Sequence, residues 1–356
     1  MKDKKKSKKK ILILCVIFCL LYIILAMRPL TTELHFSPQW TQNIFRTEEL
    51  SLEEQENLIP YKLGQVIGYF TPEGKIFSTI SYPAKASISQ NYYCTYGFSN
   101  NQTDFFSPQG TLVANLKESG FPFFDQDKIF VFLPGGNSFA YFDSQGKKMW
   151  TYENYAPITT FSSSSNGIVA GYSDGKIVSL KYDGTVDQDF FPGGSELSVI
   201  LGCDISEDGN KIAMISGHNK QRFSVAQNEN AHSKIIFHEF VPNETNQQSL
   251  VKFNDENNLV YYGYKNGLGI VNLKKLKSKH ISLPGNVVQI EKSSLEGMIF
   301  VLSRNKNTYT VTAIESPQNK AAEFTFEANC AFIQVRDNKL FIGRDDKISL
   351  MNVYRK

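Results

Sequence analysis

Histidine and carboxylate side chains are the residues of this chain that could bind a metal ion or transfer a proton. The five histidines are His35, His218, His232, His238 and His280. None forms the His-x-His or His-Glu-x-x-His spacing that places two ligands together. His232 and His238 fall in one irregular unit and could approach each other, although surface or turn positions are the plainer interpretation. Acidic runs at 204–209, 255–258 and 344–347 have fewer alternating oxygen ligands than a calcium loop requires. We therefore predict no metal site.

Nucleophilic catalysis has no better sequence support. The chain lacks a Gly-x-Ser-x-Gly motif, and Cys94, Cys203 and Cys330 are widely spaced without a Cys-x-x-Cys pair. These thiols are expected to be buried as small apolar residues. The glycine pairs at 133–136 and 191–194 lack the lysine of a phosphate-binding loop. We predict no catalytic residue and no bound cofactor, so an enzyme is not expected.

One polar segment, residues 216–233, is a candidate binding site. It lengthens its unit by ten residues or more relative to the neighbouring units, and it contains His218, Lys220, Gln221 and Arg222. Loops on a rigid scaffold often carry binding functions. We predict these four residues to contact a partner, with a solvated long hairpin as the plainer alternative.

A repeated motif shows which elements must position these residues. YFTPEG (69–74), FFSPQG (105–110) and YFDSQG (141–146) recur at intervals of 36 residues, and a shorter relative ends at Gly184. The aromatic residues suit a buried strand, and the glycine suits a turn with a positive backbone angle. A second strand follows each glycine, so each motif is predicted to be the outer hairpin of a small antiparallel sheet.

Counting the repeats predicts an all-β fold, a single β-propeller with four-stranded antiparallel blades. The seven expected units are 86–120, 121–157, 158–197, 198–247, 248–286, 287–329 and 330–356. The last unit has only three strands, so the hairpin around Gly74 is expected to supply its outer strand and close the ring. We predict seven blades; eight would result if residues before 64 add an inner pair. A pair of β-sandwiches is the structural alternative.

The N-terminus has the features of a membrane anchor. Residues 1–10 carry seven lysines and one aspartate, a net charge of +6. Because the net charge of the whole chain is +3, the remaining residues carry −3, which gives no basis for nucleic-acid binding. Residues 11–27 are uncharged and apolar, which predicts a transmembrane signal anchor, with a cleaved signal peptide or lipid attachment as alternatives. The lysines predict a cytoplasmic tail, a connector at 28–63 and a propeller at 64–356 on the other side of the membrane.

Two stretches resemble known propeller families. YFDSQGKKMWTYE (141–153), with Trp150, resembles bacterial propellers of the pyrroloquinoline-quinone type, and CDISEDGNKIAMISG (203–217) resembles the inner hairpin of WD-repeat-like blades. No blade ends in Trp-Asp, and Trp150 is the only tryptophan in the expected blades. The regular tryptophan docking of quinone-dependent dehydrogenases is therefore expected to be missing. The family includes non-catalytic scaffolds, such as the propeller lipoprotein of outer-membrane protein assembly.

These observations favour a non-catalytic scaffold. The expected protein is a single-pass protein of the bacterial inner membrane, with a periplasmic propeller that binds other envelope or periplasmic proteins. An enzyme or small-molecule sensor that uses the central channel, similar to a quinone-dependent dehydrogenase, is the alternative. A scaffold that faces the cytoplasm is a third.

Overall fold

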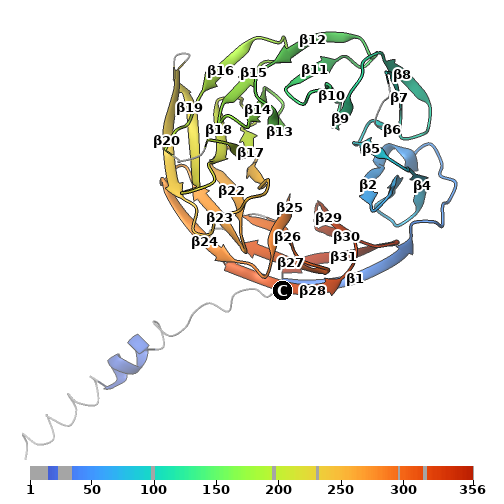
Figure 1. The fold of residues 1–356 in the computed structure, drawn as a ribbon. Coiled ribbons are helices and arrows are strands. Elements are labelled where there is room, and N and C mark those ends of the chain that lie inside the picture. The colour runs from blue at the N-terminus through green and yellow to red at the C-terminus, as the bar shows by residue number, and fades with distance from the viewer. Residues whose placement is uncertain are drawn as a thin grey trace, which may run out of the picture.

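Eight antiparallel sheets are arranged as blades around a central axis (Figure 1). The computed structural model describes residues 15–22, 34–97, 101–194, 198–229, 232–295, 297–315 and 319–355. Seven sheets have four strands and one has three. The prediction of a single all-β propeller is confirmed, whereas the predicted count of seven blades is wrong.

The blades are numbered along the chain. Blade 1 consists of β2 (Ile59–Leu63), β3 (Val66–Phe70) and β4 (Ile76–Ser81), and blade 2 of β5 (Lys85–Ile88), β6 (Tyr93–Tyr96), β7 (Thr103–Phe106) and β8 (Leu112–Leu116). Blade 3 consists of β9 (Phe121–Asp125), β10 (Lys128–Phe132), β11 (Ser138–Phe142) and β12 (Lys148–Glu153), and blade 4 of β13 (Ile158–Ser163), β14 (Ile168–Tyr172), β15 (Ile177–Leu180) and β16 (Val186–Phe190).

The second half continues this order. Blade 5 consists of β17 (Ile200–Ile205), β18 (Lys211–Ser216), β19 (Arg222–Glu229) and β20 (His232–Phe240), and blade 6 of β21 (Val251–Phe253), β22 (Leu259–Tyr264), β23 (Gly267–Asn272) and β24 (Lys277–Ser282). Blade 7 consists of β25 (Asn286–Lys292), β26 (Met298–Asn305), β27 (Thr308–Glu315) and β28 (Asn319–Glu327), and blade 8 of β29 (Ala331–Arg336), β30 (Lys339–Arg344), β31 (Lys347–Arg355) and β1 (Leu34–Asn43). A short 3₁₀ helix, η1 (Glu54–Asn57), precedes β2.

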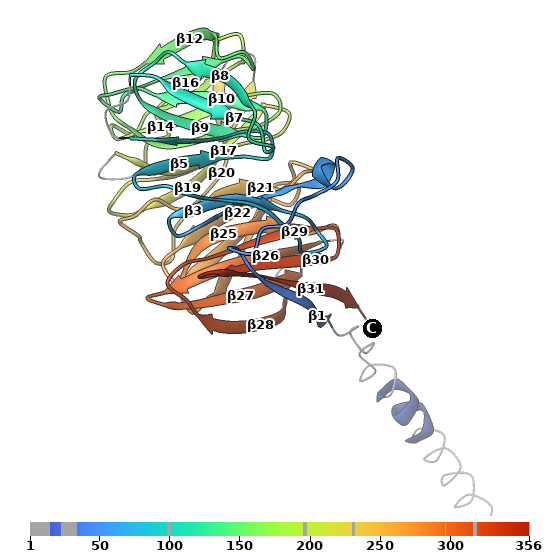
Figure 2. The same ribbon diagram turned by 90° about the vertical axis from the view of Figure 1, so that its right-hand side faces the viewer.

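The ring is closed by a strand that the sequence analysis placed in the connector. β1 pairs with β31 and supplies the outer strand of blade 8, so the two ends of the chain share one sheet (Figures 1 and 2). The hairpin around Gly74 instead forms blade 1 together with β2. Pro38 interrupts β1 and masks its alternating pattern; it is tolerated because β1 is an outermost strand, where a missing N–H is least costly.

Blade 1 is unusual because its first strand, β2, runs antiparallel to the innermost strands of the neighbouring blades. The carbonyl oxygen of Leu58, just before β2, accepts hydrogen bonds from Arg336 Nη2 at 3.4 Å and Gln90 Nε2 at 3.2 Å. Arg336 ends β29, and Gln90 follows the end of β5. β2 therefore begins where the neighbouring innermost strands end, as the second strand of a blade does. Among the described residues, blade 1 has no strand in the innermost position.

The core is divided into eight hydrophobic clusters, and each fills the junction between two neighbouring blades. The junction of blades 5 and 6, for example, buries Phe223 and Tyr262, whose rings stack at 4.1 Å between centroids. The other seven clusters fill the remaining junctions in the same way. Each middle strand thus contacts a cluster on both faces, which explains runs such as β14, all five residues of which are buried.

The repeated motif forms the predicted outer hairpin. Gly74, Gly110, Gly146 and Gly184 all have positive φ, and each donates its N–H to the carbonyl three residues earlier at 2.9–3.0 Å. Two of these glycines also receive a tryptophan from the preceding blade. A Cβ atom on Gly184 would lie 2.9 Å from Trp150, and one on Gly74 would lie 2.8 Å from Trp40. The expectation that Trp150 is the only tryptophan in the blades is therefore wrong, since Trp40 lies in β1.

Replacing Gly184 tests this docking. Gly184→Ala is expected to lower the free energy of unfolding by about 2 kcal/mol, because alanine meets both an unfavourable positive φ and the Trp150 ring. Gly193→Ala is the matched control, since Gly193 has φ +64° but no atom within 4 Å of an added Cβ. Urea unfolding followed by fluorescence measures both. Equal losses for the two variants would show that the contact with Trp150 contributes nothing.

The predicted tail (1–10) and most of the predicted anchor (11–27) lie outside the described residues. Residues 15–22 are helical. No helix within the described part of the chain has the length and apolar character needed to cross a bilayer. The anchor is therefore a prediction from sequence.

Candidate functional site

Two pockets lie at the two mouths of the central channel. The innermost strands of blades 2 to 8 begin at the face that carries the linkers between blades, which we call the linker face, and end at the opposite face. One pocket is lined by strand ends and the other by strand beginnings and a linker. Phe161 lines both, which places them on one channel.

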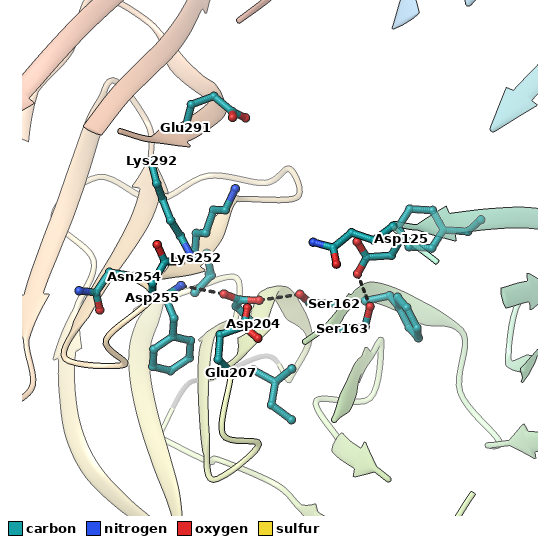
Figure 3. Close-up of a pocket in the computed structure, with 16 residues that line it drawn as sticks. Asp125, Ser162, Ser163, Asp204, Glu207, Lys252, Asn254, Asp255, Glu291 and Lys292 are labelled. Carbon is teal, nitrogen blue, oxygen red and sulfur yellow. Dashed lines mark hydrogen bonds and ion pairs between the residues drawn. The ribbon is translucent and has the colours of Figure 1, made fainter. Parts of the chain in front are cut away.

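The pocket at the opposite face, about 480 Å³, has seven charged residues among the sixteen that line it (Figure 3). Its charged residues are Asp125, Asp204, Glu207, Lys252, Asp255, Glu291 and Lys292. They come from the ends of the innermost strands in blades 3, 5, 6 and 7 and from the turns that follow. Five carboxylates against two ammonium groups give the mouth a net negative charge.

Asp204 is the central acid of this pocket. One of its carboxylate oxygens accepts a hydrogen bond from Ser162 Oγ at 2.5 Å, and the other accepts one from the N–H of Phe253 at 2.7 Å (Figure 3). Burial raises the pKa of Asp204 to about 6, against the opposing effects of these bonds and of Lys252. Because its partners belong to blades 4 and 6, this side chain of blade 5 connects three blades.

The other charged groups of this pocket also have partners within the protein. Asp125 accepts a hydrogen bond from Ser163 Oγ, and Lys292 pairs with Asp255 at 2.5 Å. Glu291 accepts a hydrogen bond from Gln289 at 3.0 Å, and burial raises the pKa of its carboxyl group. Within the described residues, no group of three or more His, Cys, Asp or Glu is arranged to hold a metal ion.

These contacts belong to a belt of polar bonds that surrounds the channel. At every junction, a side chain of one blade bonds to the next blade near the axis. The bonds from blade 1 onwards are Lys62 to Ala86 O, Phe124 N to Ser87, Ser163 to Asp125, Ser162 to Asp204, Phe253 N to Asp204, Lys252 to Ile290 O, Gln289 to Ile333, and Arg336 to Leu58 O. Many polar groups near the axis therefore hold the blades in register.

The pocket at the linker face, about 450 Å³, is lined by uncharged residues. Its lining residues are Thr160, Phe161, Thr245, Gln247, Gln248, Ser249, Leu250, Gly263, Tyr264, Asn286, Val287 and Val288. None of these described residues is Asp, Glu, Lys, Arg or His. The pocket offers hydroxyl, amide and apolar groups instead of charges.

The four predicted partner-binding residues lie at the linker face, in and beside the turn between β18 and β19, but they differ in what they contact. Gln221 is fully buried, and its amide binds the linker of blades 5 and 6: its Oε1 accepts from Thr245 N at 2.8 Å, and its Nε2 donates to the carbonyl oxygens of Gly217 and Thr245. Arg222 donates to the carbonyl oxygen of Gly193 at 3.2 Å. His218 is partly exposed and Lys220 is exposed. Gln221 thus positions a linker.

The structure also shows where the histidines and cysteines discussed above lie. His232 and His238 lie six residues apart on the extended strand β20, which separates them by about 20 Å, so they do not meet. Cys94 and Cys203 are buried as expected, and burial raises the pKa of each thiol to about 12. Cys330 is partly exposed.

Three exposed aromatic residues at the linker face were not predicted. Tyr155 is fully exposed, Phe191 is 61% exposed and Phe240 is 60% exposed. Each lies at or just after the last strand of its blade, in blades 3, 4 and 5 respectively. In the sequence, each of these aromatic residues lies near the end of a predicted repeat unit. This shared position is the signal from which they could have been predicted.

The chain is similar to other proteins over nearly its whole length. It is 27% identical over 358 residues to an uncharacterized protein of Treponema pallidum (strain Nichols), covering 98% of this chain and 95% of that protein. The solved structure of BamB from Moraxella catarrhalis superposes with a TM-score of 0.59 at 12% identity, covering 89% of this chain and 100% of that one. A chain of the mitotic checkpoint complex superposes with a TM-score of 0.56 at 13% identity, covering 92% and 95%. These structural likenesses concern the fold alone. A family model described as beta-propeller protein matches residues 1–355, and the chain therefore belongs to this family.

Proposed function

We propose that this propeller is a non-catalytic scaffold that binds a protein partner at its linker face while tethered to the bacterial cell membrane. The observation that carries the proposal is the exposure of Tyr155, Phe191 and Phe240 on three consecutive blades. Large aromatic side chains are enriched at protein interfaces and dominate their binding energy. BamB and the checkpoint-complex chain supply only the precedent of the same fold.

Contacts near these residues support one continuous binding surface. Arg222 pairs with Phe240 in the sheet and donates its hydrogen bond to Gly193, two residues after Phe191. Arg222 thereby connects the sheet that carries Phe240 to the linker that follows Phe191. His218 and Lys220 follow in the adjacent turn, so polar and basic groups border the aromatic residues, as in a typical interface rim.

The position of the N-terminus supports a free linker face. Leu34, the first residue of β1, pairs with Arg355, which forms an ion pair with Glu315 at 2.6 Å. Glu315 pairs with Met298, beside the end of β25, so the N-terminal segment joins the ring at the opposite face. A membrane anchor in residues 11–27 would turn that face towards the bilayer and leave the linker face accessible. We propose that the propeller lies in the periplasm. A reporter protein fused after Lys356 tests this, because it would behave as a cytoplasmic protein only if the propeller faces the cytoplasm.

The charged pocket is the observation in favour of the alternative, an enzyme or small-molecule sensor. Both oxygens of Asp204 already accept hydrogen bonds from neighbouring blades, and Asp255 is paired with Lys292. Such occupied carboxylates favour a role in holding the blades together. A quinone-dependent enzyme would retain the absorbance of its cofactor after purification, whereas a non-catalytic scaffold would not, so an absorbance spectrum distinguishes the two functions.

Photocrosslinking in intact cells tests the scaffold. With p-benzoylphenylalanine at Tyr155, Phe191 or Phe240, we expect at least two positions to capture the same envelope protein. Leu112, 56% exposed on the outer strand of blade 2, is the control position and is expected to capture none of it. The triple variant Tyr155→Ala, Phe191→Ala and Phe240→Ala should weaken capture by that partner at least tenfold. Equal capture from Leu112, or undiminished binding by the triple variant, would contradict the proposal.

A further inference from the structure

We infer that the linker-face pocket is an anchor site for an uncharged, extended peptide segment of the partner, which inserts an aliphatic side chain beside Leu250 and Val288. This inference rests on the proposed function, because it names the chemistry of the segment that the scaffold binds. It concerns the centre of the linker face, whereas the three aromatic residues lie at its periphery.

Three β-bulges shape this mouth of the channel. The register shifts at Thr159 in β13, Leu201 in β17 and Val288 in β25, each near the start of an innermost strand. Bulges are frequent beside functional sites because they redirect a side chain or carbonyl group. The first two have a structural use: Thr159 O accepts from Gln248 Nε2, and Leu201 O accepts from Ser249 N at 2.8 Å.

Val288, the third bulge residue, has a different setting. It is 43% exposed, lines the pocket and lies across from the same linker. Leu250, at the end of that linker, is 38% exposed. Two aliphatic side chains at the mouth of a pocket thus expose apolar surface, which a bound apolar side chain would cover.

The linker that forms one wall of the pocket is held before any partner binds. Gln221 binds both the N–H and the carbonyl group of Thr245, and its own N–H donates to Glu244 at 3.1 Å. Together with the bonds from Gln248 and Ser249 to the first two bulges, these contacts fix the linker at both ends. A fixed wall reduces the conformational entropy lost on binding, and thereby favours recognition.

The lining determines which segment fits. A charged group placed there would lose its hydration without gaining an opposite charge, which disfavours acidic and basic side chains. Asn286, Gln247 and Ser249 can bond to the N–H and C=O groups of an extended backbone. A volume of about 450 Å³ is large enough for an aliphatic side chain together with adjoining backbone. The charged pocket at the opposite face has none of this selectivity for neutral groups.

Peptide binding by the full-length chain in detergent micelles tests the inference. Three sets of capped, fluorescent ten-residue peptides would share a central leucine and differ only in flanking residues: Ser and Asn, Asp and Glu, or Lys and Arg. Fluorescence polarisation is expected to show binding of the uncharged set. Val288→Asp should weaken that binding at least tenfold, and so should Leu250→Asp.

Leu276→Asp is the matched control, since Leu276 is 52% exposed in the turn between β23 and β24, away from the pocket. It should leave binding unchanged, and the thermal midpoint of each variant reports whether the fold is intact. Preferential binding of a charged set, or unchanged affinity of well-folded Val288→Asp, would overturn the inference while leaving the crosslinks at the aromatic residues intact. Loss of those crosslinks with retained peptide binding would instead overturn the proposed scaffold.

Discussion

Trp40→Ala is expected to lower the free energy of unfolding by about 3 kcal/mol and to loosen the ring where the two ends of the chain meet. Trp40 lies on β1, and its ring contacts Phe70 of blade 1 and Phe341 of blade 8 at centroid distances of 6.4 and 6.1 Å. It also covers Gly74. Since blades 8 and 1 are joined through β1, losing this side chain weakens both the closing strand and the junction beside it.

Trp150→Ala is the matched control for this prediction. Trp150 covers Gly184 in the same way, but it joins blades 3 and 4, which are consecutive in the chain. Both variants should lose stability in urea unfolding. Only Trp40→Ala should accelerate hydrogen exchange in β29, β30 and β31, because only there does an outer strand come from the other end of the chain. Identical exchange patterns would show that closure does not depend on Trp40.

The parts of the fold visible in the sequence are those with local causes. A turn that needs glycine at positive φ and an aromatic residue on the strand before it produces a pattern at fixed spacing, so Gly74, Gly110, Gly146 and Gly184 predicted the outer hairpins. The seven predicted units each correspond to one blade. β1 was missed because it pairs with a strand more than 300 residues away. β2 pairs with the neighbouring strand β3, but its residues were assigned to the predicted connector.

The candidate site was predictable only in position. The unusual length of the unit that contains residues 216–233 pointed to His218, Lys220, Gln221 and Arg222, which lie at the linker face, but what each residue contacts depends on distant segments. Gln221 is polar in sequence and buried in the structure because the linker at Thr245 satisfies its amide. The bulge at Val288 leaves no composition signal, since it is a property of strand pairing.

A second large effect is expected at Asp204, whose pKa burial raises to about 6. Between its ordinary pKa near 4 and this value, the folded protein binds more protons than the unfolded chain. The free energy of unfolding therefore falls as pH rises through this window, by about 2–3 kcal/mol from this group. Carboxyl groups with lowered pKa, such as those of Asp183 and Asp208, have the opposite pH dependence, so a variant is needed to isolate Asp204.

Asp204→Asn and Asp204→Ala separate the charge from the hydrogen bonds. Asparagine can accept from Phe253 N and donate to Ser162 Oγ without a buried charge, so we expect stability close to wild type at pH 4 and about 2 kcal/mol higher at pH 7.5. Alanine leaves both groups without this partner and should be about 3 kcal/mol less stable than asparagine at either pH. Urea unfolding across pH 4–8 measures all three proteins. If Asp204→Asn keeps the wild-type pH dependence, the raised pKa does not affect stability; if Asp204→Ala matches Asp204→Asn, the connection of blades 4, 5 and 6 does not depend on this side chain.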